Sequence, residues 1–293
     1  MDEKKSIYGL VGYPVEHSLS PQMHNRAFQE LQVDAVYKLF SLPEEELDAF
    51  FAEIKLQDSP VFGLNITVPY KEKVIQYLDG LSPFAEKIRA VNTIVVDKHR
   101  KLIGFNTDGP GFLTHLMELG FNTGAKRIAI MGAGGAARAI ISVLCIVQER
   151  PESIKIYDID KERADYLIED LGSRFDVSII QTVHSIDDLN VELADLLINA
   201  TPIGLKDNDP CLFEEDFFHQ DMMVYDLIYN PEETALLKMA RKRGAKVSNG
   251  LGMLFYQGVL AFQHWANVEL DQTIKDKMRE SLEQGLKNKD NHV

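Results

Sequence analysis

The chain has 293 residues, 45% of them hydrophobic and 26% charged, which suits two ordinary domains with their own cores. Its 31 basic and 45 acidic side chains give a formal net charge of 31 − 45 = −14, which disfavours nucleic acid and anionic membranes as partners. The two cysteines form no metal-ligand or disulfide pattern and no apolar run is long enough to span a membrane, so we expect a cytoplasmic protein without a metal site.

The first half of the chain alternates short apolar runs with helix-like stretches. Strands are predicted at residues 7–11, 36–40, 61–68 and 90–96, and helices at residues 21–31 and 43–55. Ser20 is the expected N-cap of the first helix, with Pro21 at its first position. Pro69 is expected to open a further helix with Lys71 in its first turn.

The second half repeats the alternation more regularly after a predicted helix at residues 110–119 and a glycine-containing linker at 120–124. Strands are predicted at residues 127–131, 153–157, 177–181, 196–199, 223–227 and 246–248, with helices at 134–147 and 161–171. The last helical stretch begins near residue 253, has no strand after it, and is expected to pack back on the first half. This pattern predicts an α/β protein with mostly parallel sheets.

A dinucleotide-binding signature lies between the strand at 127–131 and the helix after it. The connecting segment is Gly132-Ala133-Gly134-Gly135-Ala136-Ala137, which fits G-x-G-x-x-A in its required strand-to-helix context. In this pattern Gly132 permits the tight turn, Gly134 lets the backbone approach a diphosphate, and Ala137 lets the helix pack close to the sheet. The helix N-terminus then offers unpaired N–H groups to the diphosphate.

Asp158 follows the next predicted strand, where an acid can bind the adenosine ribose hydroxyls and repel a 2′-phosphate. This favours NAD as the cofactor, with NADP as the alternative because Lys161 and Arg163 are near enough in sequence to contact a phosphate. In the competing interpretation Asp158 caps a turn or the next helix, a role for which Asp160 is an equally good candidate.

Two serines stand at the start of the first predicted helix, in the segment His17-Ser18-Leu19-Ser20-Pro21. Ser20 before Pro21 is a standard N-cap, and Ser18 can support the turn. Alternatively, both hydroxyls donate to a carboxylate next to a helix N-terminus, which favours an anion. The local chemistry leaves both interpretations open.

Lys71 and Asp108 are the candidate acid–base pair. A cation in the first turn of a helix is electrostatically misplaced, and a local rule broken without visible compensation often marks a functional site. The plainer alternative is that Lys71 and Lys73 are two solvated lysines on an exposed turn. Asp108 stands just before a predicted helix and can cap it, or can orient the Lys71 amine.

Eight motifs taken in order resemble the shikimate dehydrogenase family, from about residue 8 to residue 265. They are Ser18-Leu19-Ser20-Pro21, Asn65-Ile66-Thr67-Val68-Pro69-Tyr70-Lys71, Ala90-Val91-Asn92-Thr93, Asn106-Thr107-Asp108-Gly109, the segment from Gly132 to Ala137, Asn199-Ala200-Thr201-Pro202-Ile203-Gly204, Asp226-Leu227-Ile228-Tyr229-Asn230-Pro231 and Gly250-Leu251-Gly252-Met253.

The resemblance implies a role for each candidate residue. Lys71 and Asp108 would form the catalytic pair at the hydroxyl that is oxidised. The substrate carboxylate would be held by Ser18, Ser20 and Tyr229, and the ring hydroxyls by Thr67, Asn92 and Gln257. The nicotinamide end of the cofactor would be lined by Thr201, Leu227, Gly250 and Met253.

The resemblance also implies the domain organisation. Residues 1–109 would form an α/β substrate-binding and catalytic domain, and residues 110–249 a Rossmann-type dinucleotide-binding domain. Residues 250–293 would be C-terminal helices that return to the first domain.

Some motif positions differ between branches of the family, and these positions favour one cofactor and one substrate for this chain. Family members that use NADP commonly carry Asn-Arg-Thr after the second Rossmann strand, whereas Asp158-Ile159-Asp160 is similar to the NAD-using quinate/shikimate branch. Ser18 with Ser20 is similar to the shikimate-type carboxylate site, since quinate-preferring members often have Thr at the second position. We therefore expect reversible hydride transfer between NAD(P) and the ring hydroxyl of shikimate, with NAD favoured and quinate dehydrogenase, or dual specificity, as the alternative.

The expected partner is thus a small molecule, shikimate or quinate, with neither nucleic acid nor membrane. A non-catalytic nucleotide-binding sensor is a remote alternative, disfavoured because both Lys71 and Asp108 are present. The sequence leaves open whether the protein is a monomer or a homodimer, and whether its role is biosynthetic or catabolic.

Overall fold

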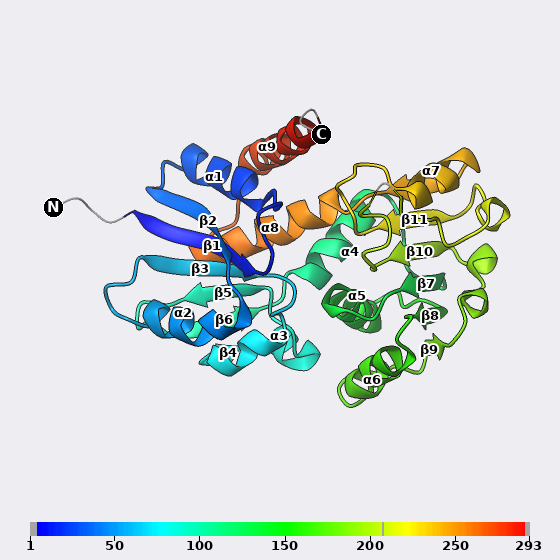
Figure 1. The fold of residues 1–293 in the computed structure, drawn as a ribbon, viewed down its shortest axis with the longest axis horizontal. Coiled ribbons are helices and arrows are strands. Elements are labelled where there is room, and N and C mark those ends of the chain that lie inside the picture. Colours follow the sequence, from blue (N-terminus) through cyan, green and yellow to red (C-terminus); the bar gives the residue numbers. More distant parts are fainter. Residues whose placement is uncertain (1–4, 207, 291–293) are drawn as a thin grey trace. The chain divides into compact units, whose positions relative to one another are not determined.

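The computed structural model describes residues 5–206 and 208–290, which fold into two compact units (Figure 1). The first unit runs to Gly111 and resumes at Leu254, and the second is Phe112–Met253. Helices α4 (Asp108–Glu118) and α8 (Leu251–Ala266) carry the chain from one unit to the other. The C-terminal helices therefore belong with the first unit, as the fold prediction required. Among the described residues, no helix is both long and apolar enough to cross a membrane.

The first unit is built on a six-stranded sheet in the order β2-β1-β3-β5-β6-β4. Its strands are β1 (Ser6–Gly12), β2 (Ala35–Ser41), β3 (Val61–Ile66), β4 (Gly80–Leu81), β5 (Thr93–Val96) and β6 (Leu102–Phe105). β1 is parallel to β2 and β3, whereas β5 is antiparallel to both β3 and β6. Three of its five strand pairings are parallel and two are antiparallel, so this sheet is mixed but mostly parallel, as predicted. The connection between β5 and β6 is too short for a parallel crossover, which makes the pair a hairpin.

Helices cover both faces of this sheet, with α1 and α9 on one side and α2 and α3 on the other (Figure 1). They are α1 (Ser20–Glu30), α2 (Leu47–Ile54), α3 (Pro83–Ile88) and α9 (Gln272–Asp290), with short 3₁₀ helices at Glu44–Glu46 and Lys73–Tyr77. On the α2 side, Leu64 and Ile66 of β3 pack with Phe51 and Ile54 of that helix. On the opposite face, the ring of Trp265 lies against Gly63 of β3, where a Cβ would collide with it.

The second unit contains a fully parallel sheet in the order β12-β11-β10-β7-β8-β9. Its strands are β7 (Arg127–Met131), β8 (Ser153–Tyr157), β9 (Ile180–Val183), β10 (Leu196–Asn199), β11 (Met223–Asp226) and β12 (Lys246–Ser248). Numbered from β7 as the first strand, this order is the 3-2-1-4-5-6 arrangement of dinucleotide-binding folds. The α/β fold class with a Rossmann-type unit is confirmed.

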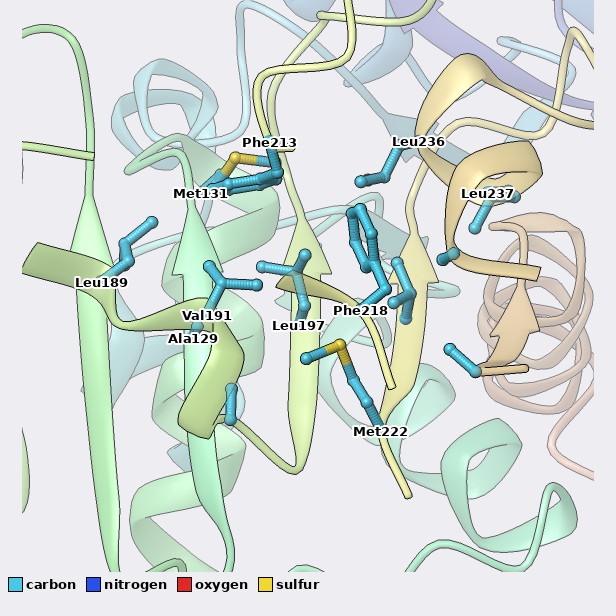
Figure 2. Packing of buried hydrophobic residues seen from close by; sticks show 14 of the residues in the cluster. Ala129, Met131, Leu189, Val191, Leu197, Phe213, Phe218, Met222, Leu236 and Leu237 are labelled. Atoms are coloured by element: carbon cyan, nitrogen blue, oxygen red, sulfur yellow. The ribbon is translucent and has the colours of Figure 1, made fainter. Parts of the chain in front are cut away.

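One core cluster of the second unit is an apolar layer on one face of its sheet. Figure 2 shows Ala129 and Met131 of β7 and Leu197 of β10 gathered with Phe213 and Phe218. The helices of this unit are α5 (Gly135–Ile146), α6 (Lys161–Gly172) and α7 (Ala235–Lys242), with 3₁₀ turns at Asp187–Leu189, Val191–Leu193 and Glu215–Phe217. From α7, Leu236 and Leu237 join the layer (Figure 2).

Several predicted boundaries move in the structure, mainly where side chains make turns. The strand expected at 177–181 lies at Ile180–Val183, because Asp176 Oδ1 accepts from Ser178 N and Val177 O accepts from Ile180 N. The strand expected at 90–96 begins only at Thr93, and the strand expected at 61–68 ends at Ile66. Strand β6 and helices α3 and α7 were not predicted.

Candidate active site

The topology of the first sheet brings four polar segments to one edge. Parallel strands β1 and β3 both end there, so the segments that follow Gly12 and Ile66 leave the sheet side by side. Antiparallel pairing places the start of β5 and the end of β6 at the same edge, with Thr93 opposite both Asn65 and Phe105. Four segments therefore adjoin neighbouring strand ends: residues 13–20, 67–71, 92 and 106–108.

Lys71 and Asp108 form a tight ion pair at this edge. Lys71 Nζ lies 2.7 Å from Asp108 Oδ2, and their side chains are 14% and 7% exposed. Asn92 Nδ2 donates to the second carboxylate oxygen, Asp108 Oδ1, at 2.8 Å. Charge-assisted bonds of this length are strong, so the amine is held in one place with one side open to solvent or a ligand.

Asp108 is free for this contact because another residue caps its helix. Asn106 Oδ1 accepts from the backbone N–H of Asp108 at 3.0 Å and of Gly109 at 3.4 Å, the first two residues of α4. The interpretation of Asp108 as a residue just before the helix and its cap was therefore wrong. It is the first residue of α4, and its carboxylate points to Lys71 and Asn92.

Lys71 does not lie in the first turn of a helix, as the sequence suggested. Thr67 to Glu72 form an irregular turn, and only a five-residue 3₁₀ helix begins at Lys73. The argument from a misplaced cation at a helix N-terminus is therefore wrong. Two contacts fix Lys71 instead: its side chain pairs with Asp108, and its carbonyl accepts from Val91 N at 2.7 Å.

Asn92 is the centre of a buried polar network around the pair. Its Nδ2 lies 2.9 Å from Thr107 Oγ1 and 3.3 Å from Gln257 Oε1, and its Oδ1 accepts from Thr107 N at 2.7 Å. Gln257, on α8, donates in turn to Leu254 O at 2.7 Å. The structure thus brings together Lys71, Asp108, Asn92 and Gln257, which the sequence placed far apart.

A deeper layer of this network was not predicted. Tyr37 donates its hydroxyl to Asn65 Oδ1 at 2.8 Å, and Asn65 Nδ2 donates to Thr93 Oγ1 at 3.1 Å. Thr93 Oγ1 lies 3.1 Å from Asn92 Oδ1, so the chain of bonds reaches the catalytic candidates. The available signal was Asn65 itself, an amide inside an otherwise apolar strand, which needs a partner when buried.

Ser18 and Ser20 lie together at the beginning of α1. Their hydroxyl oxygens are 3.1 Å apart, and Ser20 N donates to Ser18 Oγ at 3.2 Å. Ser20 is the first residue of α1 and Leu19 its N-cap, with no side-chain cap bond, so the N-cap assignment of Ser20 was wrong. Thr67 lies beside the end of β1, where its N–H donates to Val11 O at 2.9 Å.

In the second unit the glycine-rich loop begins where β7 ends. Gly132 has φ +100°, and a Cβ there would lie 2.7 Å from Ala200 O, so a side chain is excluded. Gly134 is the N-cap of α5, and Ala137 is fully buried inside that helix. The loop, with Ala133, Gly135 and Ala136, therefore presents a helix N-terminus at the carboxyl edge of the sheet, a cradle that fits a diphosphate.

Asp158 and Arg163 flank this loop. Asp158 Oδ2 accepts from Ala133 N at 2.7 Å and its Oδ1 from Asp160 N at 2.9 Å. Asp160 caps α6 by accepting from Arg163 N at 3.2 Å, so the helix cap is Asp160, whereas Asp158 caps the turn at residues 158–160. A Cβ on Gly134 would lie 3.2 Å from Arg163 Nη2, which places the guanidinium next to the loop.

The remaining candidates lie at the same carboxyl edge, in the loops after β10, β11 and β12. Thr201 Oγ1 donates to Asn199 Oδ1 at 2.7 Å. Gly250 approaches Leu227 so closely that a Cβ would collide with its carbonyl. Met253 is buried at the end of the second unit, and Tyr229 belongs to the same unit, where burial raises the pKa of its phenol.

Comparison with known proteins identifies the family. Residues 10–94 match the model of the shikimate dehydrogenase substrate binding domain. A shikimate dehydrogenase (NADP(+)) of Methanopyrus kandleri is 42% identical over 292 residues, covering 98% of each chain. The chain belongs to the shikimate dehydrogenase family. It is therefore an NAD(P)-dependent oxidoreductase, as predicted from the sequence motifs in its two halves.

Solved structures of the shikimate dehydrogenase family extend the comparison to ligands. A shikimate 5-dehydrogenase of Listeria monocytogenes, in complex with shikimate and NAD, has a TM-score of 0.83 at 33% identity and covers 96% of this chain and 99% of its own. A quinate dehydrogenase of Corynebacterium glutamicum, in complex with NAD, has a TM-score of 0.85 at 29% identity over 96% and 99%. Relatives thus include proteins named for either substrate and either cofactor.

Proposed function

We propose that this shikimate dehydrogenase family member reversibly transfers a hydride between NAD(P) and the ring hydroxyl of shikimate. The observation that carries the proposal is the Lys71–Asp108 pair, fixed at the sheet edge by Asn92, which also contacts Gln257 of α8. Asp108 Oδ2 holds the Lys71 amine on one side and leaves the rest of the nitrogen, including the lone pair of the neutral amine, for the reacting hydroxyl. The nicotinamide, when bound, supplies or accepts the hydride.

Each residue near the pair has one task in this proposal. As a neutral amine, Lys71 takes the hydroxyl proton during oxidation. The ammonium so formed, whose charge the carboxylate of Asp108 balances, returns the proton during reduction. Ser18 and Ser20 donate to the substrate carboxylate at the N-terminus of α1, together with Tyr229. The ring hydroxyls bind Thr67, Asn92 and Gln257, and the amides of Asn92 and Gln257 are already fixed by the network.

For the cofactor we propose NAD as the favoured partner and NADP as the alternative. The carboxylate of Asp158 is fixed against the glycine-rich loop by Ala133 N and Asp160 N, in position to accept from ribose hydroxyls. Ile159, next in sequence, is 90% exposed and offers no charge to a 2′-phosphate. Arg163 beside Gly134 is the cation that favours NADP, as does the name of the Methanopyrus relative.

A cofactor test compares kcat/KM for NAD and NADP in the wild type and in Asp158→Asn/Ile159→Arg. The asparagine keeps an oxygen for Ala133 N, so the glycine-rich loop keeps this bond while the repulsive charge and the bond from Asp160 N are lost. We expect wild type to favour NAD and the variant to move the ratio toward NADP by about tenfold or more, since one repelled or paired phosphate is worth about 1.4 kcal/mol or more. Lys161→Gln serves as the charge control. Strong NADP preference in wild type would overturn the cofactor proposal but not the reaction.

Quinate is the second candidate substrate, supported by the likeness to the Corynebacterium quinate dehydrogenase. We favour shikimate because Ser20 stands where quinate-preferring members often carry threonine. Measuring kcat/KM for both acids with the preferred cofactor decides between them. Ser20→Thr is expected to raise the quinate-to-shikimate ratio, and Ser18→Thr, the matched change at the neighbouring hydroxyl, is not. A wild type that oxidises neither acid would refute the proposed function.

A further inference from the structure

Asp226, the last residue of β11, is a fully buried carboxylate with three donors around it. Its Oδ1 accepts from Asn199 Nδ2 at 2.9 Å and from Ile228 N at 3.0 Å, and its Oδ2 accepts from Thr234 Oγ1 at 2.7 Å. The Thr234 oxygen also accepts from Leu237 N at the start of α7, so its proton is available for Asp226. Burial raises the pKa of Asp226, and the three donors oppose that shift.

Asn199, the first of these donors, shapes the loop that follows β10. Its second amide hydrogen goes to Ile203 O at 3.0 Å, while its Oδ1 accepts from Thr201 N at 3.1 Å and Thr201 Oγ1 at 2.7 Å. All four bonding positions of this amide are therefore used. A rotation of the Asn199 side chain would break the hydrogen bonds that hold the loop carrying Thr201.

The same carboxylate controls the loop that follows β11. Ile228 N is bonded directly to Asp226, and Leu227 N donates to Asn199 O at 2.9 Å. Ile228 O in turn accepts from Gly250 N at 3.1 Å, where the chain enters α8. Three loops at the carboxyl edge of the sheet thus depend on one buried group, and burying a charge is costly unless such bonds compensate it.

We infer that Asp226 is a positioning residue, which fixes from inside the unit the loops carrying Thr201, Leu227 and Tyr229. The inference rests on the proposed function, because those three residues are the ones expected to meet the nicotinamide and the substrate carboxylate. Asp226 itself, with no exposed surface, touches neither ligand. Its effect on catalysis is through the orientation of other groups, where a displacement of about 1 Å can cost about a hundredfold in rate.

The first test needs no ligand. In Asp226→Asn, the amide nitrogen replaces the oxygen to which Thr234 donates, so this charge-assisted bond becomes a weaker neutral one in which the amide donates to the hydroxyl. We expect amide hydrogen exchange in the ligand-free protein to become about tenfold faster in peptides covering residues 199–204 and 226–231, roughly the difference between a charged and a neutral hydrogen bond, and to be unchanged at 132–137. Asp195→Asn is the control, because Asp195 binds Arg127 N and Lys126 at the opposite edge of the sheet.

The second test separates positioning from stability, using the full chain at a temperature where every variant is folded. Asp226→Asn is expected to lower kcat by about tenfold to a hundredfold and to increase the primary deuterium isotope effect on kcat, because hydride transfer becomes slower. Binding of ADP-ribose, which lacks the nicotinamide, should not change. Thr234→Val should reproduce these effects, and Thr234→Ser, which keeps the hydroxyl, should restore them to near wild type.

The outcomes are distinct. Unchanged exchange in both loops, with wild-type kcat and isotope effect in Asp226→Asn and Thr234→Val, would overturn the inference even if the melting temperature falls. If Asp226→Asn does not fold, Thr234→Val alone decides the question. If wild type oxidises neither shikimate nor quinate, the proposed function fails, and the exchange measurement still decides whether Asp226 orders the loops.

Discussion

His24 makes the first unit sensitive to acid. It lies on α1 with no exposed surface, its ring stacked on Tyr37 at a centroid distance of 4.4 Å. Neither ring nitrogen has a hydrogen-bond partner in the described structure. Burial alone lowers the pKa of His24 from 6.5 to about 3, because a charged imidazolium would be without water in an aromatic core.

The sign and size of the effect follow from proton linkage. In the unfolded chain His24 binds a proton below its ordinary pKa of 6.5, whereas in the folded chain it stays neutral down to about pH 3. Stability is therefore complete above pH 6.5 and falls as the pH drops from 6.5 toward 3. At pH 5, about 1.5 units below the unfolded-state pKa and at about 1.36 kcal/mol per unit, the loss is about 2 kcal/mol.

The assay is urea unfolding at pH 8 and pH 5 for the wild type and His24→Phe, which keeps the stacking and removes the titration. The chain has a single tryptophan, Trp265, with its ring centroid 5.1 Å from His24, so its fluorescence reports unfolding of this unit. The stability difference between variant and wild type should grow by about 2 kcal/mol from pH 8 to pH 5. His99→Gln, at an exposed turn, is the control. A difference independent of pH would refute the reasoning.

Three further predictions test the two units separately. Lys71→Ala should lower turnover by about a thousandfold while calorimetry still detects substrate, and retained turnover would refute its acid–base role. Gly250→Ala places a Cβ against the Leu227 carbonyl and should cost about 3 kcal/mol, read as a lower melting temperature; an unchanged value would contradict the close approach. Asp170→Asn weakens a buried pair in which Arg138 Nη1 lies 2.5 Å from the carboxylate; it should cost about 3 kcal/mol in urea unfolding, with a loss below 1 kcal/mol counting against it.

The Rossmann-type unit was the more predictable half. Its strands are bounded by strong local signals, such as the glycine turn after Met131, and parallel pairing follows from the strand–helix alternation. The β5–β6 hairpin of the first unit was missed because β6 has only four residues, one of them Gly104, and its partners are set by tertiary pairing. Helix α7 was missed although Thr234 capping a leucine-rich stretch was a usable signal.

For the site, residue types could be read from the sequence but their contacts could not. The motifs named Lys71, Asp108, Asn92 and Gln257, yet nothing local says that Gln257 returns from α8 to within 3.3 Å of Asn92. That proximity depends on the C-terminal segment joining the first unit, which is a property of the whole fold. The helix-dipole argument for Lys71 failed because Pro69 opens a turn instead of a helix.

In each unit, the candidate site acid differs from a helix-capping acid because a neighbouring residue caps the helix. Asn106 caps α4 two residues before its competitor Asp108, and Asp160 caps α6 two residues after Asp158. Asn and Asp suit the N-cap equally well, so spacing and residue type alone cannot assign the two roles. The backbone geometry determines which residue caps the helix, because the capping side chain must reach the N–H groups of the first helical turn. The other side chain is then left to bind Lys71 in one unit and Ala133 N in the other, which is where a substrate hydroxyl and a ribose are proposed to meet the protein.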